Sequence, residues 1–92
     1  MILYYELKTV NGHGVPKEGV QFPNIEIALE AAIDYWGADY TDIHFDKKWY
    51  MCDNSYENKN LTTKFTHVLA KTKEDTLVCI GFLYAIEEIT KY

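Results

Sequence analysis

The residues of this chain with the clearest potential for chemistry are carboxylates that lie close together in the sequence. Residues 18–46 contain seven acids and neither lysine nor arginine. The members of this acidic segment are Glu18, Glu26, Glu30, Asp34, Asp39, Asp42 and Asp46. Carboxylates accept charge-assisted hydrogen bonds from lysine and arginine, the same donors that bind phosphate. The segment therefore favours contact with a basic surface.

The rest of the chain has the opposite charge balance. The protein has 92 residues and a net charge of −5. Outside the acidic segment, seven acids face nine lysines, and the sequence contains no arginine. A nucleic-acid-binding protein normally presents a basic face with arginines for bidentate contacts. We therefore expect no direct binding to nucleic acid, and partners with basic surfaces instead.

A helix over residues 24–36 is expected to position the first acids. Its apolar residues recur at the spacing of one helical face, namely Ile25, Ala28, Leu29, Ala32, Ile33 and Trp36. Asn24 suits the N-cap, and Gly37 suits a left-handed C-terminal residue. We expect the helix to pack through Ile25, Leu29, Ile33 and Trp36.

The opposite face of this helix carries Glu26, Glu30 and Asp34 at intervals of four residues. Four residues of helix rise about 6 Å, so the carboxylates form a row. That spacing is similar to the spacing of phosphates along one DNA strand, which rises roughly 3.4 Å per base along the axis. Asp39, Asp42 and Asp46 are expected to prolong the row. The alternative is an acidic face that only interacts with solvent, as most charged runs do.

Strands are expected on both sides of the helix. Residues 1–9, 40–45, 49–52 and 61–71 alternate or are rich in β-forming residues, and Asn11-Gly12 is typical of a hairpin turn. We expect Val20 and Phe22 to form a short returning strand, and 40–45 and 49–52 to form a second hairpin. Residues 76–83 are apolar on both faces, which indicates a central strand.

The fold class that follows is α+β. Residues 1–92 are expected to form a single domain with an antiparallel sheet of about four to six strands. The main helix packs on one face of this sheet. The pattern leaves two alternatives open for residues 84–92, a short helix or a continuation of the last strand.

The sequence lacks the motifs of known metal and catalytic sites. The residues of interest are His13, His44, His67, Cys52 and Cys79, and no two of them lie at the short spacing of structural zinc sites. Both cysteines are expected to be small core residues rather than nucleophiles. No glycine pattern matches a phosphate-binding loop. We therefore expect no metal, no cofactor and no enzymatic activity, with an unrecognised small enzyme as an alternative.

The size, acidity and carboxylate row resemble the DNA-mimic inhibitors that phages make against host defence. The composition, rich in lysine, asparagine, tyrosine and isoleucine without arginine, is similar to that of low-GC phage proteins. Within this group the chain resembles the anti-restriction proteins of the Arn family. The resemblance implies a dimeric DNA mimic that inhibits a host restriction endonuclease of the McrBC kind. It is a resemblance of overall character, without a diagnostic motif.

Two further expectations concern partners and location. The aromatic residues Tyr4, Tyr5, Trp49, Tyr50 and Tyr84 exceed what one small sheet buries, which favours a homodimer. It also leaves open an alternative function, a protein-interaction module that binds through aromatics without DNA mimicry. No stretch is long and apolar enough for a membrane span, and the N-terminus does not resemble a signal peptide. With no cysteine-pairing motif, we expect a cytoplasmic protein in the host cell.

Overall fold

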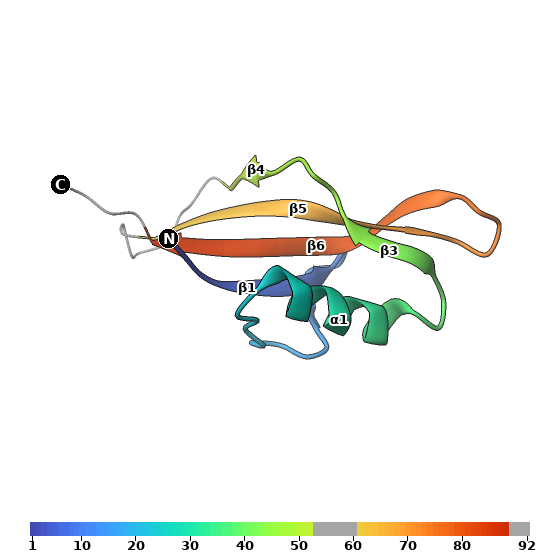
Figure 1. Cartoon of the computed structure of the whole chain (residues 1–92), viewed down its shortest axis with the longest axis horizontal. Coiled ribbons are helices and arrows are strands. Elements are labelled where there is room, and N and C mark those ends of the chain that lie inside the picture. Colours follow the sequence, from blue (N-terminus) through green and yellow to red (C-terminus); the bar gives the residue numbers. More distant parts are fainter. Residues whose placement is uncertain (53–60, 89–92) are drawn as a thin grey trace.

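The computed structural model describes residues 1–52 and 61–88, and it has an α+β architecture in which one helix lies against an antiparallel sheet (Figure 1). The expected fold class is therefore confirmed. The sheet has six strands, in the order β2-β1-β6-β5-β3, and β4 also pairs with β5. In chain order the elements are β1 (Ile2–Thr9), β2 (Gly14–Val15), α1 (Ile25–Trp36), β3 (Thr41–Phe45), β4 (Tyr50–Met51), β5 (Leu61–Lys71) and β6 (Leu77–Glu88).

The last strand, β6, is the central strand of the sheet, as its apolar sequence predicts. It pairs with β1 on one side and with β5 on the other, so that Leu83 lies between Leu7 and Thr66. The strand continues as far as Glu88, which settles the alternatives for residues 84–88 in favour of a strand. The remainder of that segment, residues 89–92, lies outside the described residues.

Two expected strand pairings are wrong. The partner that returns along β1 is β2, which pairs Leu7 with Val15, whereas Phe22 makes only an isolated bridge to Tyr5. The strand β4 does not form a hairpin with β3, because both pair with β5. A long strand such as β5 offers enough backbone hydrogen-bonding groups for two short partners placed end to end.

The helix packs on the sheet through small residues, not through its isoleucines. Ala28 and Ala32 are 0% exposed and Trp36 is buried, whereas Leu29 is half-buried and Ile33 is 47% exposed. Ile25 is also exposed, so of the four expected contact residues only Trp36 belongs to the core. Because alanine has a short side chain, the helix approaches the sheet closely along Ala28 and Ala32. The isoleucines are left on its flanks.

Trp36 fits against the sheet at the position of a glycine. A Cβ atom on Gly81 would lie 2.5 Å from the carbonyl oxygen of Lys8 and 2.9 Å from the indole ring of Trp36. Gly81 pairs with Thr9 on β1 and with Val68 on β5, so the indole lies over the middle of the sheet. The missing side chain of Gly81 therefore creates the space for the largest residue of the helix core.

The predicted cap is confirmed at the N-terminal end of the helix and wrong at the C-terminal end. The Asn24 side chain accepts a hydrogen bond of 2.9 Å from the backbone N–H of Ile27, which confirms it as the N-cap. Gly37 has φ −64°, so the expected left-handed conformation is wrong. Its N–H instead continues the helical pattern with a 2.8 Å hydrogen bond to the carbonyl of Ile33.

The two faces of the sheet have different environments. The helix side holds the buried core, including Tyr5, Leu7, Val68 and Leu83. The opposite side carries half-buried rings, whose members are Tyr50, Phe65, His67, Phe82 and Tyr84. We call this group the aromatic face. The pairings Tyr50 with Phe65 and Phe65 with Tyr84 place it across three neighbouring strands.

Candidate functional site

Three carboxylates of the acidic segment lie on the outer surface of α1. Glu26, Glu30 and Asp34 are all exposed, and they point away from the alanine side that contacts the sheet. Within the described part of the chain, no lysine or histidine forms an ion pair with any of them. The helix holds them in one row on a rigid backbone. This row is the candidate site, and we call it the acidic row.

The N-terminal end of the acidic row lies above the core of the sheet. Burial, and then the carboxylates of Glu26 and Glu87, raise the pKa of the Tyr5 phenol. The Glu26 carboxylate is therefore close enough to β1 to disfavour a negative charge on Tyr5. Glu26 is also in the first helical turn, where a carboxylate is favoured by the positive end of the helix dipole.

The C-terminal end of α1 concentrates negative potential. The last turn contains no basic residue, and the carbonyl groups there form the negative end of the helix dipole. Asp34 lies in this last part of the helix, and Asp39 follows it in the exposed turn toward β3. Cations are favoured at such a helix end, typically by 0.3–1 kcal/mol at an exposed position. A lysine or arginine from a partner would therefore be attracted most strongly here.

Asp42 is partly neutralised, in contrast to the acids of the helix. The Nζ of Lys71 lies 3.7 Å from its carboxylate and 3.4 Å from that of Asp75. The absence of lysine from residues 18–46 therefore does not leave Asp42 without a counter-charge. The ion pair between Asp42 and Lys71 could not be predicted, because the two residues are far apart in the sequence. They come together because Thr41 on β3 pairs with Lys71 on β5. Surface ion pairs contribute about 0–1 kcal/mol, so the pair leaves Asp42 available to a stronger partner.

Asp46 stabilises the turn that follows the C-terminal end of β3. It is half-buried, and its carboxylate accepts a 2.7 Å hydrogen bond from the backbone N–H of Lys47. The hydroxyl of Thr66 lies 2.9 Å from the carbonyl oxygen of Asp46 and 2.8 Å from that of Lys48, and the two carbonyls share the single hydroxyl proton. Asp46 thereby fixes the turn after β3. The acids most accessible to a partner are those between Glu26 and Asp42.

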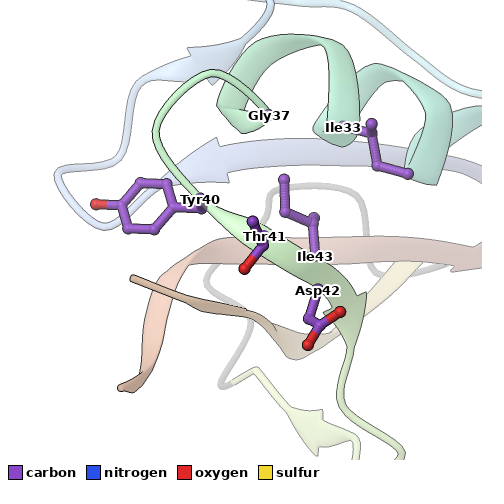
Figure 2. Close-up of a pocket in the computed structure, with 6 residues that line it drawn as sticks. All are labelled: Ile33, Gly37, Tyr40, Thr41, Asp42 and Ile43. Atoms are coloured by element: carbon purple, nitrogen blue, oxygen red, sulfur yellow. The ribbon is translucent and has the colours of Figure 1, made fainter. Parts of the chain in front are cut away.

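A shallow pocket lies where the chain turns from α1 into β3 (Figure 2). Its volume is about 310 Å³, and its lining residues are Ile33, Gly37, Tyr40, Thr41, Asp42 and Ile43. An apolar wall beside a carboxylate suits a lysine or arginine, which places its aliphatic stem on apolar surface and its charge in a polar environment. The sequence did not indicate this pocket, because it depends on Ile33 being turned away from the core.

The cysteines and histidines do not assemble into a metal site among the residues that the structure describes, where no group of three potential ligands comes together. The expectation that both cysteines are core residues is wrong. Cys79 is exposed and Cys52 is half-buried. The reason is a bulge at Ile80, because Val68 pairs with Gly81 while the adjacent Leu69 pairs with Cys79. The extra residue changes which side chains face the core.

The two thiols are expected to react at different rates with a thiol reagent. Burial raises the pKa of the Cys52 thiol, although the positive charge of Lys8 acts in the opposite direction. Only the thiolate is nucleophilic, so Cys52 reacts slowly. Partial labelling of the folded protein followed by mass-spectrometric mapping should find the label mainly on Cys79. In urea the two sites should react equally, and preferential labelling of Cys52 in the folded protein would contradict this.

Comparison with known proteins adds no relative. No protein family, curated protein or solved structure shows detectable similarity to this chain. Among the described residues, no helix has the length and apolar character needed to cross a membrane.

Proposed function

We propose that this protein is a non-enzymatic DNA mimic that inhibits a DNA-binding protein by occupying its DNA-binding surface. The observation that carries the proposal is the acidic row, in which Glu26, Glu30 and Asp34 are exposed on a rigid helix without a described cation beside them. Unpaired like charges four residues apart destabilise a helix slightly. A partner that brings lysines and arginines removes this repulsion.

The mechanism is substitution of carboxylates for phosphates. Glu26, Glu30, Asp34, Asp39, Asp42 and Asp46 stand in for phosphate groups and accept hydrogen bonds from the basic residues of the target. Because the helix fixes the first three, little conformational entropy is lost on binding. The pocket beside Asp42 receives one basic side chain, with its stem against Ile33. Negative potential around the row also accelerates the encounter with a basic surface.

The proposed target is a host restriction endonuclease of the McrBC kind, and the proposed setting is the host cytoplasm. The support for this target is the resemblance to the Arn-type anti-restriction proteins. We also propose that the protein acts as a homodimer, which the half-buried rings of the aromatic face support. No cofactor or metal is part of the mechanism, and the protein itself binds no nucleic acid.

A titration of nuclease activity tests the proposal. A purified McrBC-type endonuclease is assayed on its modified DNA substrate with increasing amounts of this protein. Cleavage should stop when the inhibitor reaches a fixed ratio to the enzyme, and added substrate DNA should restore it, because both compete for one surface. Inhibition that excess DNA does not reverse would contradict mimicry, and so would inhibition by catalytic amounts of the protein.

The aromatic face favours a second candidate function, a protein-interaction module that binds without DNA mimicry. Five rings with centroids 5.4–6.3 Å apart form one continuous surface on the sheet. Aromatic residues are enriched in protein interfaces. Lysine substitutions in the acidic row separate the two functions, because they abolish binding by a mimic and leave an aromatic contact largely intact.

A further inference from the structure

The aromatic face is a large surface that no described element covers. The helix contacts β1, β2 and β3 from the other side of the sheet. The ring centroids of Tyr50 and Phe65 are 5.5 Å apart, and those of Phe65 and Phe82 are 5.8 Å apart. All five members are half-buried, so each ring keeps part of its surface in water. A contiguous group of rings that stays partly accessible to water is typical of an interaction site.

A buried hydroxyl beside these rings gives an independent reason to expect a partner. Thr63 is 3% exposed, and its Oγ1 has no hydrogen-bond partner in the described structure. It lines a small pocket of about 70 Å³ together with Glu6, Lys8, Tyr84 and Ile86. A buried polar group without a partner costs free energy, because it has lost its hydrogen bonds to water. A hydrogen-bonding group that enters this pocket from another molecule would remove that cost.

The charges on this side of the sheet indicate that the molecule bound to the aromatic face is a second copy of the chain. Glu6 and Lys8 flank the rings on β1, and the Nζ atoms of Lys8 and Lys48 lie 5.2 Å from the ring centroids of Tyr84 and Tyr50. Glu88 is on the same side, at the end of β6. Acids and lysines therefore balance here, unlike on the acidic row. A two-fold interface must be complementary to itself, which a balanced surface satisfies and a uniformly charged one does not.

The size of the aromatic face is sufficient for a weak dimer. The face extends over about eight residues on each of β1, β6 and β5, and β4 adds two, which gives roughly 400 Å² at the usual strand dimensions. Two copies would then bury about 800 Å², which is typical of weak, transient interfaces. A basic partner or a nucleic acid would need a charged face, whereas the two acids and two lysines described on this face cancel in charge.

We propose that two copies of this chain associate face to face through the aromatic face, with Phe65, Phe82 and Tyr84 at the centre of the contact. The inference rests on the homodimer of the proposed function and names its interface. Stacked sheets lie about 10 Å apart, and each helix adds a layer about 10 Å thick. The two acidic rows therefore face outward on opposite sides of the dimer, and each dimer binds two target molecules.

Substitutions at Phe82 test the interface, because Phe82 contacts Phe65, His67 and Tyr84. Light scattering at tens of micromolar should show a dimer for the wild type and monomers for Phe82→Lys and Phe82→Glu separately. An equimolar mixture of the two variants should restore the dimer, since the opposite charges then meet. Tyr35→Lys, at an exposed position on the helix, is the matched control and should remain dimeric. A monomeric wild type, or a folded Phe82→Glu that stays dimeric, would overturn the interface.

Histidine labelling of the wild type tests the same interface without any substitution. His67 belongs to the aromatic face, whereas His13 is in an exposed loop. Modification by diethyl pyrocarbonate should fall at least about tenfold for His67 between dilute and concentrated protein, and should not change for His13. Equal labelling of His67 at both concentrations overturns the proposal even if the Phe82 variants fail to fold.

The outcomes for the interface and for DNA mimicry are separable. A Phe82→Lys monomer that still competes with DNA for the target supports the mimic and shows that dimerisation uses a different surface from the acidic row. A wild-type dimer that does not compete with DNA refutes the mimic and leaves the interface intact. A complex with one target per dimer would overturn the outward arrangement of the two acidic rows.

Discussion

Lysine substitution of Glu30 and Asp34 is expected to weaken binding to the target by at least about 100-fold, equivalent to about 2.7 kcal/mol. Both residues are exposed, and neither forms an ion pair within the described structure. The substitutions therefore leave the fold intact and replace two attractive contacts with two repulsive ones. Like charges juxtaposed in an interface cost several kcal/mol. Titration calorimetry with the purified nuclease measures the change in Kd.

A matched control separates the acidic row from total charge. Glu74→Lys combined with Glu88→Lys changes the net charge by the same amount, at the tip of the β5–β6 hairpin and at the end of β6. Both control positions are exposed, and neither forms an ion pair within the described structure. This variant should bind with an affinity within about threefold of the wild type, since charges outside the contact are screened beyond roughly 10 Å. Equal weakening in the two variants would show that only the overall charge matters.

Replacement of Trp36 by alanine is expected to lower the free energy of unfolding by about 3–5 kcal/mol. Trp36 is the largest side chain that the helix buries, and its ring fills the space above Gly81. Its removal leaves a cavity between helix and sheet, because two alanines cannot fill the gap. Urea unfolding followed by circular dichroism measures the change.

Tyr35→Ala is the control for this substitution. Tyr35 is adjacent to Trp36, with ring centroids 5.2 Å apart, but it is 47% exposed. Its removal should cost at most about 1 kcal/mol, as is usual for a substitution outside the core. If both substitutions cost the same, the helix is not held to the sheet by Trp36.

The long elements could be predicted from the sequence because their periodicity is uninterrupted. The residues of β1 alternate around Tyr5 and Leu7, and those of β5 alternate over eleven residues. Short elements and irregular positions could not be predicted in the same way. β2 and β4 have two residues each, too few for a pattern, and the bulge at Ile80 has no mark in the sequence.

The helix shows why an apolar stripe does not identify the residues in contact. Ile33 and Ala32 both belong to the stripe, yet only Ala32 is buried. Hydrophobicity alone favours isoleucine, but the distance between helix and sheet is set by Gly81 and by the ring of Trp36. Which part of a broad stripe faces the core is therefore decided by packing between distant segments.

The part of the candidate site that lies on a single helix could be predicted from the sequence. The exposure of Glu26, Glu30 and Asp34 follows from the helical period. The ion pair between Asp42 and Lys71 depends on strand pairing across the chain, as does the aromatic face. The expected surplus of aromatic surface is wrong for Tyr5, which belongs to the core, and for Trp49, which packs against the core. That expectation also omitted Phe65, His67 and Phe82, which lie on the aromatic face.

Competition with DNA at two salt concentrations tests the central claim, that the carboxylates of residues 26–46 replace phosphates, most directly. The target is bound to fluorescently labelled DNA, and this protein is added at 50 mM and at 200 mM salt. If the carboxylates replace phosphates, the protein displaces the DNA completely, and its own affinity, measured without DNA, falls steeply at the higher salt, as expected for contacts between charged groups. A ternary complex with bound DNA, or an affinity that does not change with salt, would contradict the claim.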